Sequence, residues 1–572
     1  MNDSPPRTDS AGRARLRLDW LGVVLSLAWT MAWFYGLDGR SLGEPDEGRY
    51  AEVAREMAAS GDWLTPRLDG FNFFDKPALH YWGSAAAYSV FGVHEWTARL
   101  WCALTGLLAM MAIGWAGTRL FGRQAGGFAA AILGSTLLYA ASAHINTLDM
   151  GVTAFLTVGM ACFLVAQFDP SAQPTRGRLN ALMWTALGLA VLSKGLIGLV
   201  LPGLVLAVYM LWRRAWSMLG RLSLPLGTLL VALICAPWFI AMSYMHPGFF
   251  DYFFIREHFT RFLSSVDDRQ QPIWFFPVIV VLGIFPWTVL LPISMSGWRA
   301  AHEDISAQQF LWVWVAVILV FFSLSHSKLP FYILPLFPAL ALLLARAAVI
   351  LPAAALTRRL GAIALMGLSG ALLAQLVPIG EHASVSADPF HYTMTGLSIA
   401  CALVALAAFA GRLVLLRSQG DGLGRSWAIH LLALAALCGW QILLMSLQPL
   451  ALNLSAASVA RIIKLEMGPH TKVFTVSMSL RGLPFYLQRL VTVAADTPDD
   501  IMPGVASRPE GYIAELGQFA QRWRAGNDEI AVMPLVSLAQ LQATGLPFSE
   551  LGREGKYVVI ARNTRTQMSL TH

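Results

Sequence analysis

The stretch from residue 42 to residue 82 concentrates charged side chains in a chain that is otherwise strongly apolar. Asp46 and Glu47 stand near its beginning, and Asp75 and Lys76 stand between aromatic and apolar residues near its end. Carboxylates are favoured at the start of a helix, so the first pair has an ordinary structural explanation. The four groups also suit chemistry, because an acid can hold a cation or a proton and a lysine can hold an anion. We therefore predict that this stretch contributes the centre of an active site.

Two short helices are predicted to position these groups. Pro45 is suited to a first helical turn and Gly61 to a helix end, which gives one helix between them. Pro77 and Gly92 bound a second, more apolar helix in the same way. Both are predicted to be amphipathic helices beside the membrane. The face of the first helix that is predicted to be buried consists of Tyr50, Val53, Ala54, Met57 and Ala58.

Further acids and bases occur in later short segments between apolar runs. Asp149 stands in a turn too tight to project far, so we expect its carboxylate to line a cavity at the membrane boundary, where an unpaired charge is costly. Arg256, His258 and Arg261 are spaced through residues 251–269. Those cations could grip a phosphate, and the aromatic residues among them also favour an interfacial helix.

The composition places all of these groups in a polytopic membrane protein. Of the 572 residues, 56% are hydrophobic and only 13% are charged, and the mean hydropathy of +0.57 is too high for a soluble globule. Runs long enough to cross the hydrocarbon core recur through the first 450 residues, and we predict about thirteen transmembrane helices. The predicted spans are 18–37, 96–117, 125–144, 148–168, 179–193, 196–212, 222–244, 273–295, 309–325, 331–350, 360–380, 395–416 and 427–452.

The distribution of basic residues predicts an orientation for these spans. The run at 18–37 follows several arginines and is long for a signal-peptide core, so we interpret it as a retained signal anchor with a cytoplasmic N-terminus. The predicted cytoplasmic side collects arginines, whereas Lys76, Lys194 and Lys328 fall on the opposite side with most of the acids. Lysines placed against the positive-inside trend are expected to have an anionic partner. Tyr332 begins the next span beside Lys328 and could reach the same cavity.

The composition changes after residue 452, which predicts a membrane domain over 1–452 and a small α/β domain over 453–572. The second domain contains no GxGxxG motif, P-loop or metal-ligand spacing, so we interpret it as a packing or partner-docking domain on the outer side. Its predicted strands are Lys472–Met478, Leu490–Ala494, Glu529–Met533 and Tyr557–Ala561, and its predicted helices are Gly511–Arg524 and Val536–Ala543.

Several other classes of protein are excluded by what the chain lacks. The five cysteines all lie inside apolar runs and form no CxxC motif, so the sequence shows neither a disulfide framework nor a cysteine metal site. No Walker motif is present, which argues against ATP hydrolysis. The net charge of +7 comes mostly from the predicted cytoplasmic arginines and therefore reports topology rather than nucleic-acid binding.

Acids and separated cations at one membrane face suit a lipid-linked phosphosugar, and five short motifs give this pattern a family resemblance. The motifs are PDE-x-RYAE from residue 45, FDKP from residue 74, LD at 148–149, EH-x-x-RF from residue 257 and SKLP-x-YIL from residue 327. In combination they resemble the integral-membrane glycosyltransferases of the GT-C fold, and among these the aminoarabinose transferases of glycosyltransferase family 83. The resemblance covers most of residues 40–350.

The resemblance implies an activity, a location and partners. Members of this family transfer 4-amino-4-deoxy-L-arabinose from undecaprenyl phosphate to lipid A phosphates at the periplasmic face of the bacterial inner membrane, which gives resistance to polymyxin and other cationic peptides. The expected partners are therefore the lipid-linked sugar as donor, lipid A as acceptor and membrane lipids, with no nucleic acid. We expect a monomer whose active site and C-terminal domain face the periplasm.

The resemblance also implies roles for individual residues. The family's acidic positions fall on Asp46 and Asp149, which we predict to be catalytic together with Glu47. A divalent metal, which GT-C enzymes often use, would lie near Asp75 and His258, although the spacing alone does not establish it. No other cofactor is predicted. The residues predicted to hold the donor phosphate are Lys76, Arg261, Lys328, Tyr332, Arg256 and Lys194.

A lipid A phosphate is already ionised near neutral pH, so the predicted catalysis is positional and electrostatic rather than dependent on a strong base. Asp46 and Asp149 would orient the acceptor or the sugar ammonium, and Asp46 is the preferred candidate for proton transfer. Two alternatives stay open at this point. One is another polyprenyl-phosphate-dependent GT-C enzyme, such as a protein mannosyltransferase, and the other is a lipid flippase without chemistry. Transporters place their charges near the bilayer midplane, whereas these charges cluster at one face.

Overall fold

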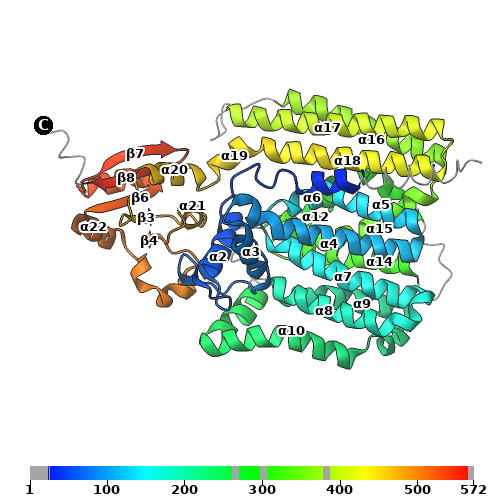
Figure 1. Ribbon diagram of the computed structural model, residues 1–572, viewed down its shortest axis with the longest axis horizontal. Coiled ribbons are helices and arrows are strands. Elements are labelled where there is room, and N and C mark those ends of the chain that lie inside the picture. The colour runs from blue at the N-terminus through cyan, green and yellow to red at the C-terminus, as the bar shows by residue number, and fades with distance from the viewer. Residues whose placement is uncertain (1–23, 25, 261–269, 297–305, 378–386, 564–572) are drawn as a thin grey trace, which may run out of the picture.

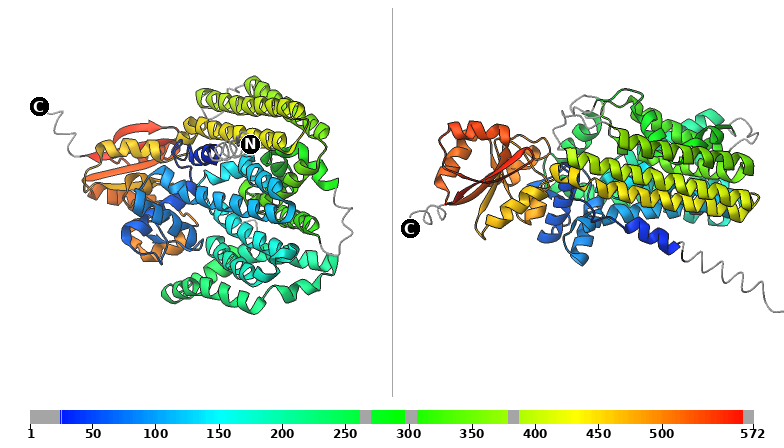
Figure 2. Two further views of the ribbon diagram at one scale, coloured as in Figure 1. Left: turned by 45° about the vertical axis from the view of Figure 1, so that its right-hand side comes forward. Right: turned by 90° about the horizontal axis from the view of Figure 1, so that it is seen from above.

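The computed structural model describes residues 24, 26–260, 270–296, 306–377 and 387–563. Most of the chain forms a bundle of long helices, and the C-terminal residues form a sheet domain at one end of that bundle (Figure 1). Helices α2 (Asp46–Ser60) and α3 (Leu79–Phe91) lie between the bundle and the sheet domain. Both views in Figure 2 show the sheet domain at one end of the helical bundle.

The bundle is built from long helices, several of which are bent or flanked by short 3₁₀ segments. The 3₁₀ segments are η1 (Pro170–Thr175), η2 (Trp216–Arg221), η4 (Trp287–Leu290) and η6 (Pro330–Leu336), and a π-helix, η3, covers Asp251–Thr260. The α-helices are α4 (Glu95–Phe121), α5 (Arg123–Ser135), α6 (Leu137–Ala143), α7 (Leu148–Phe168), α8 (Arg176–Lys194), α9 (Ile197–Arg213), α10 (Leu224–Met245), α12 (Phe275–Gly283), α13 (Leu291–Ser296), α14 (Ala307–Leu324), α15 (Phe337–Ile350), α16 (Ala353–Leu376), α17 (Ala387–Arg417) and α18 (Gly422–Ser446).

Within the described residues, eight helices are long and apolar enough to cross a membrane, or up to ten if each bent pair is one span. The bent pairs are α5 with α6, which meet at 69°, and the 275–283 helix with the 287–294 segment, which meet at 104°. Every predicted span from 96–117 onward overlaps one of these helices, a bent pair, the less apolar helix α8 or the shorter apolar helix α9. The predicted signal anchor at 18–37 lies partly outside the described residues. The prediction of a polytopic helical membrane protein is confirmed.

The core of the bundle is apolar and includes several fully buried tryptophans, among them Trp33, Trp287, Trp314 and Trp440. Helix α4 packs against α5 and α7, and α8 joins α7 to α9 and α10. Helices α16, α17 and α18 pack on one another along one side of the bundle. Many large apolar side chains remain exposed on α10, α16 and α17, as expected where helices face lipid.

The first-loop helices form as the sequence predicts. Helix α2 begins directly after Pro45 and ends at Gly61, whose positive φ of 72° is the left-handed conformation that glycine adopts easily. Helix α3 begins two residues after Pro77 and ends at Gly92. The sequence did not predict the two-stranded hairpin between them, β1 (Arg67–Leu68) with β2 (Phe71–Asn72), since strands of two residues carry no periodicity.

The C-terminal domain is a six-stranded sheet with the order β5-β4-β3-β6-β8-β7. Strands β5, β4, β3 and β6 run parallel, and β8 and β7 continue the sheet in antiparallel pairing. Separate apolar clusters cover its two faces. The strands are β3 (Lys472–Val476), β4 (Thr492–Ala494), β5 (Tyr512–Ile513), β6 (Asp528–Pro534), β7 (Ser549–Glu554) and β8 (Tyr557–Asn563), and the helices are α19 (Gln448–Asn453), α20 (Ala457–Glu466), α21 (Leu483–Leu487), α22 (Leu516–Ala525) and α23 (Leu535–Ala543), with short 3₁₀ turns η7 (Met502–Ser507) and η8 (Pro509–Gly511).

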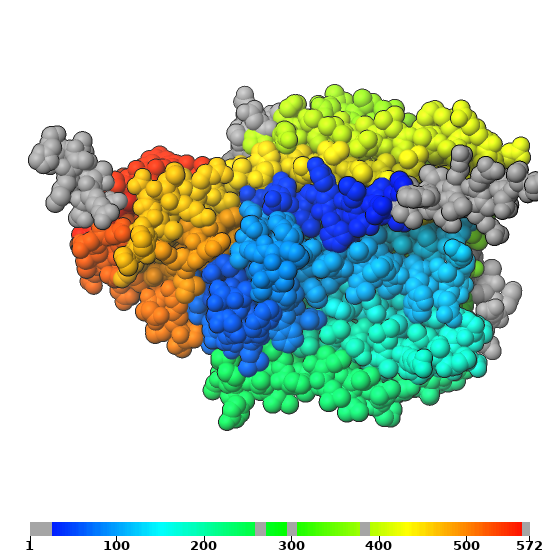
Figure 3. Space-filling model, viewed as in Figure 1, coloured from blue at the N-terminus to red at the C-terminus, as the bar shows by residue number. Residues whose placement is uncertain are grey.

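All four predicted strands of this domain, and both predicted helices, are present. The first predicted helix begins at Leu516 rather than at Gly511, because Tyr512 and Ile513 pair with β4 instead. The C-terminal domain also packs on the first loop. Phe485, Val493 and Ile501 share one apolar cluster with residues of α2 and α3. The space-filling view shows this contact between the blue first loop and the yellow and orange C-terminal residues (Figure 3).

Candidate active site

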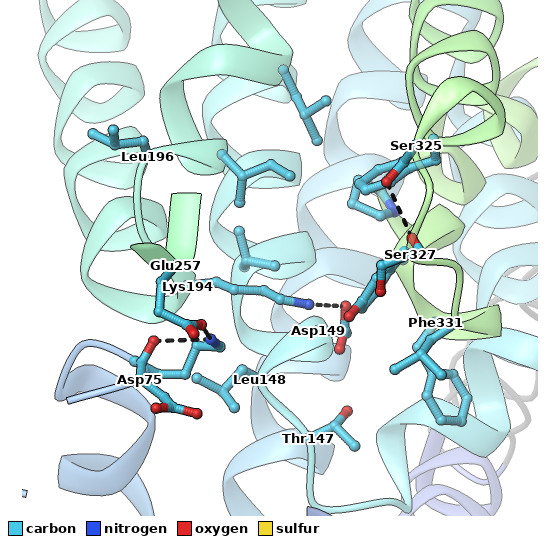
Figure 4. A pocket seen from close by; sticks show the side chains of 18 of the residues that line it. Asp75, Thr147, Leu148, Asp149, Lys194, Leu196, Glu257, Ser325, Ser327 and Phe331 are labelled. Carbon is cyan, nitrogen blue, oxygen red and sulfur yellow. Dashed lines mark hydrogen bonds and ion pairs between the residues drawn. The ribbon is translucent and has the colours of Figure 1, made fainter. Parts of the chain in front are cut away.

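A cavity of about 410 Å³ lies where the first loop meets helices α7, α8 and α9 and the η6 segment. One part of its wall is charged and includes Asp46, Asp75, Lys76, Asp149 and Lys194. The remaining wall is mostly apolar and consists of Leu196, Ile197, Val200, Leu201, Phe321, Phe322, Leu329, Phe331 and Pro335. The cavity can therefore hold a molecule that has a charged head and an apolar tail (Figure 4).

Asp46 is the first residue of α2 and is the most exposed carboxylate of this wall, with 37% of its side chain exposed. Its nearest cationic neighbour is Arg49, whose Nη1 lies 3.7 Å from Asp46 Oδ1. The two groups are close enough to form an ion pair but too far apart for a hydrogen bond. The carboxylate of Asp46 is therefore accessible to a ligand in the cavity.

Asp149 and Lys194 form an ion pair within the same wall. Asp149 is in the first turn of α7 and Lys194 is the last residue of α8, so the two helix ends bring their side chains together. The Lys194 ammonium group donates a hydrogen bond to Asp149 Oδ1 and lies 4.6 Å from the centre of the Tyr332 ring. Lys194 therefore contacts both the predicted acid Asp149 and the predicted phosphate ligand Tyr332, and Figure 4 shows its pair with Asp149.

Lys76 is held by a second carboxylate. Its ammonium group donates to Glu257 Oε2 at 2.7 Å and to the backbone oxygen of Asp75 at 2.9 Å. The Tyr252 hydroxyl donates to Asp75 Oδ1 at 2.8 Å. Burial of Asp75, and next to it the negative charge of Glu257, raise the pKa of the Asp75 carboxyl to about 6. The π-helix η3 therefore supplies Glu257 as the counter-ion of Lys76 and Tyr252 as the hydrogen-bond donor to Asp75.

The described residues contain no group of three or more histidine, cysteine or acidic side chains that could hold a metal ion. Asp75 takes the Tyr252 hydroxyl as its hydrogen-bond partner, and the side chain of His258 lies outside the described residues. The residues that the structure describes do not by themselves fit a divalent metal.

Glu47, which the sequence analysis predicted to be catalytic, does not line the cavity with Asp46 and Asp149. Its side chain is buried and accepts hydrogen bonds from Arg99 Nε at 2.8 Å and from Arg40 Nη1 at 2.9 Å, as well as from the backbone of Asn146. Arg99 is itself buried and also donates to three backbone oxygens of the segment before α2. Glu47 is thus the counter-ion of two arginines and fixes α2 to α4.

The other predicted phosphate ligands are less closely grouped. Tyr332 lines the cavity, whereas Lys328 is buried outside its wall between the lining residues Ser327 and Leu329. The Arg256 guanidinium lies over the Tyr252 ring, 5.1 Å from its centre, and also does not line the cavity. The prediction for Arg261 lies outside the described residues.

Arg49, Tyr50 and Glu257 also line the cavity, although the sequence analysis did not assign them to the site. Arg49 and Tyr50 follow Asp46 on α2, so the first helical turn brings Arg49 to the same side. Arg49 also forms an ion pair across the domain boundary, from its Nε to Asp500 Oδ2 at 3.1 Å. Asp500 belongs to the loop after β4, and no local sequence signal connects it to α2.

Comparisons with known protein families divide the chain in two. Residues 42–253 match the model of the dolichyl-phosphate-mannose-protein mannosyltransferases. Residues 459–562 match the aminoarabinose transferase C-terminal domain. The first match contains α2 and most of the residues around the cavity, and the second covers nearly all of the sheet domain.

Individual relatives align over larger parts of the chain. An undecaprenyl phosphate-α-4-amino-4-deoxy-L-arabinose arabinosyl transferase of Sodalis glossinidius is 37% identical over 332 residues, which is 57% of this chain and 58% of the relative. The corresponding transferase of Aeromonas salmonicida is 34% identical over 422 residues, 73% of this chain and 74% of the relative. The crystal structure of ArnT from Cupriavidus metallidurans bound to undecaprenyl phosphate superimposes with a TM-score of 0.89 at 32% identity, covering 96% of this chain and 98% of that one.

Proposed function

The chain belongs to the family of undecaprenyl phosphate-α-4-amino-4-deoxy-L-arabinose arabinosyl transferases, and on this basis we propose that it is a membrane glycosyltransferase that transfers aminoarabinose from undecaprenyl phosphate to a phosphate group of lipid A. The observation that carries the proposal is the cavity in which Asp46 and Asp149 share one wall with Lys76 and Lys194, beside a long apolar wall. The charged part suits a phosphosugar and the apolar part suits a polyprenyl chain.

The proposed reaction is a displacement at the anomeric carbon of the sugar. An ionised oxygen of the acceptor phosphate forms a bond to that carbon, and the bond from the carbon to the donor phosphate oxygen breaks. The leaving undecaprenyl phosphate keeps the electron pair, so no proton transfer is required for the balance. What the protein must supply is the alignment of two anions and compensation of the charge that develops on the leaving phosphate.

We assign the lysines to the donor phosphate and the acids to the sugar. In the free protein Lys76 pairs with Glu257 and Lys194 pairs with Asp149. A donor phosphate can replace either carboxylate as the partner of the lysine, so that each ammonium group always has an anionic partner. Tyr332 lies next to Lys194 and can donate its hydroxyl to the same phosphate. Asp46 is accessible and can hold the ammonium group of aminoarabinose, which would fix the orientation of the ring.

The proposal includes a location and a domain division. Residues 1–452 would form the transferase domain in the bacterial inner membrane, with residues 453–572 as a second domain, and the cavity would open to the periplasm. We propose that the protein acts as a monomer. Transfer of a cationic sugar would lower the negative charge of lipid A and weaken the binding of polymyxin and other cationic peptides.

The test is reconstitution of the purified protein with undecaprenyl-phosphate-linked aminoarabinose and lipid A. Mass spectrometry should show lipid A with one added aminoarabinose, and undecaprenyl phosphate should be released in equal amount. The match of residues 42–253 to protein mannosyltransferases favours one second candidate, transfer of mannose from a polyprenyl phosphate to a hydroxyl group of a protein. Incubation with polyprenyl-phosphate mannose and a serine-rich peptide distinguishes the two. Lipid movement across the vesicle membrane without any transfer would instead indicate a flippase.

A further inference from the structure

The Arg49 guanidinium lies at the boundary between the cavity and the C-terminal domain. It is on the first turn of α2, lines the cavity, and has only 12% of its side chain exposed. On one side its Nη1 is 3.7 Å from Asp46, and on the other its Nε is 3.1 Å from Asp500. One cation thus connects a predicted catalytic acid to a residue of the sheet domain.

Among the described residues, the Arg49 side chain donates no well-aligned hydrogen bond, and its Nε is buried without a hydrogen-bond acceptor. The 3.1 Å contact between Arg49 Nε and Asp500 Oδ2 is therefore an ion pair in which the N–H bond does not point at the carboxylate oxygen. A guanidinium group has five N–H donors, and a buried one is stabilised when they meet an anion. Phosphate is an anion whose geometry matches two of these donors at once.

Asp500 is fixed by its own domain rather than by Arg49 alone. Arg481 donates to both oxygens of Asp500, from Nη2 at 2.6 Å and from Nε at 3.2 Å. Arg481 in turn is attached to the segment before α2, because its backbone N–H and that of Gly482 donate to the Glu44 carboxylate at 3.0 and 2.6 Å. Asp500 therefore holds a defined position relative to the start of α2.

The backbones of the two domains approach closely at the same place. A Cβ atom built on Gly48 would lie only 2.7 Å from the backbone N and Cα of Gly482. This close approach leaves no room for a side chain at position 48 and sets the separation between α2 and the α21 segment. The position of Arg49, one residue further along α2, is consequently dependent on the C-terminal domain.

We propose that Arg49 binds the acceptor phosphate, and that Asp500 of the C-terminal domain is the positioning residue that aims it. This inference rests on the proposed transferase function and names the acceptor side of the same site. Lys194 ends α8 just before α9, whose apolar residues line the part of the cavity where we expect the donor lipid. Arg49 lies on α2 against the sheet domain, and we expect the phosphorylated sugar head of lipid A to bind on this side of the cavity.

The proposal assigns the C-terminal domain a part in substrate binding. The domain need not touch either substrate, since it acts by setting the direction of one guanidinium group. It follows that loss of the Asp500 carboxylate should weaken acceptor binding and leave donor binding unchanged.

The experiment measures transfer rates by the wild type, Arg49→Gln, Asp500→Asn and the control Glu550→Gln. Glu550 lies in the same domain and pairs with Arg553, but both side chains are on the exposed edge strand β7. Rates are measured against lipid A at saturating donor and against donor at saturating lipid A. We expect Arg49→Gln to raise the apparent KM for lipid A about tenfold or more and Asp500→Asn about threefold or more. The KM for the donor should stay within about twofold in both variants, and the control should match the wild type.

An equal rise in both KM values, or an unchanged KM for lipid A, would overturn the proposal. If Arg49→Gln does not give a folded protein by size-exclusion chromatography, Arg49→Lys is used instead, because it keeps the charge and loses the planar fork. An unchanged KM for lipid A in Arg49→Lys and Asp500→Asn would overturn the proposal as well. Absence of transfer by the wild type would refute the proposed function itself and this inference with it.

Discussion

Lys194 at the end of α8 donates a hydrogen bond to the carboxylate of Asp149 at the start of α7. The chain between them forms all of α7 and α8, so the pair closes a hairpin of two membrane helices at the level of the cavity. Asp149 is a predicted catalytic acid and Lys194 is a predicted phosphate ligand. In the free protein each group therefore compensates the charge of the other, and a substrate phosphate that binds Lys194, as we propose, would have to compete with Asp149.

Substitution Lys194→Met should leave the Asp149 carboxylate without its partner near the membrane. Because the two side chains are 13% and 18% exposed, we expect a loss of roughly 2 kcal/mol of stability, less than for a fully buried pair. The double variant Asp149→Asn with Lys194→Met should recover about half of this loss, since the unpaired charge is removed. Thermal unfolding in detergent measures the effect. Additive losses in the two single variants and the double variant would show that the pair is not coupled.

Lys76 and Glu257 form the second pair, and Glu257→Gln should make Lys76 more available. The amide cannot compete with a phosphate for the ammonium group as a carboxylate does, so we expect undecaprenyl phosphate to bind roughly three- to tenfold more tightly. Lys76→Gln should weaken the same binding by roughly tenfold or more. Equilibrium binding to the purified protein measures both, with Glu550→Gln as the control. Weaker binding by the Glu257 variant would mean that Glu257 supports the donor rather than competing with it.

Glu47→Gln should impair folding rather than chemistry. The substitution leaves Arg99 and Arg40 without the carboxylate that compensates both of them, and removing one partner of a buried ion pair costs about 3–5 kcal/mol. We expect a low yield of monodisperse protein and a reduced Tm. Any fraction that does fold should keep its KM values. A stable variant with low turnover would instead support the predicted catalytic role of Glu47.

Local signals allowed the sequence to predict the elements, but not the partners of the charged residues. Pro45 and Gly61 act on their own neighbours, so the ends of α2 could be predicted from them. Asp46 and Glu47 are adjacent, yet successive helical residues point about 100° apart, and only one of them faces the cavity. Which one does so depends on where Arg99 lies, and that is a tertiary contact.

The strands and ion pairs that the sequence did not predict lack a local signal in the chain. Strand β7 (SELGRE) is an exposed edge strand without apolar alternation, and β1 and β2 are two residues each. The ion pairs of Lys76 with Glu257 and of Arg49 with Asp500 join segments far apart in the chain, so no spacing rule connects them. The family motifs did identify Lys76, but they did not show which carboxylate it meets.

The Asp75 carboxyl predicts a dependence of stability on pH. Its pKa is raised to about 6, chiefly by burial, so the folded protein binds this proton more strongly than the unfolded chain does. Between about pH 4 and pH 6 the stability of the wild type should therefore fall as the pH rises, by at most about 3 kcal/mol. Asp75→Asn keeps an oxygen for the Tyr252 hydroxyl and removes the titration. Melting curves from pH 4 to pH 8 should show the Tm of the wild type falling relative to that of the variant, and parallel curves would contradict the assignment.

The last prediction concerns Asp46 and separates a structural acid from a catalytic one. Asp46 lies in the first turn of α2, where its charge interacts favourably with the helix dipole, but it makes no capping hydrogen bond. Asp46→Asn should therefore cost at most about 1 kcal/mol of stability. If the carboxylate orients the ammonium group of the sugar or accepts a proton, turnover should fall roughly 100-fold or more.

Binding of undecaprenyl phosphate should stay near the wild-type value in Asp46→Asn, because the lysines that we assign to the phosphate are unchanged. Donor binding and sugar transfer are measured side by side on the same preparations of wild type and variant. Asp46→Glu serves as the matched control for charge, since it keeps the carboxylate and changes only its reach, and it should retain more activity than Asp46→Asn. Full activity in Asp46→Asn would assign Asp46 to the start of α2 alone and would leave Asp149 as the acid of the site.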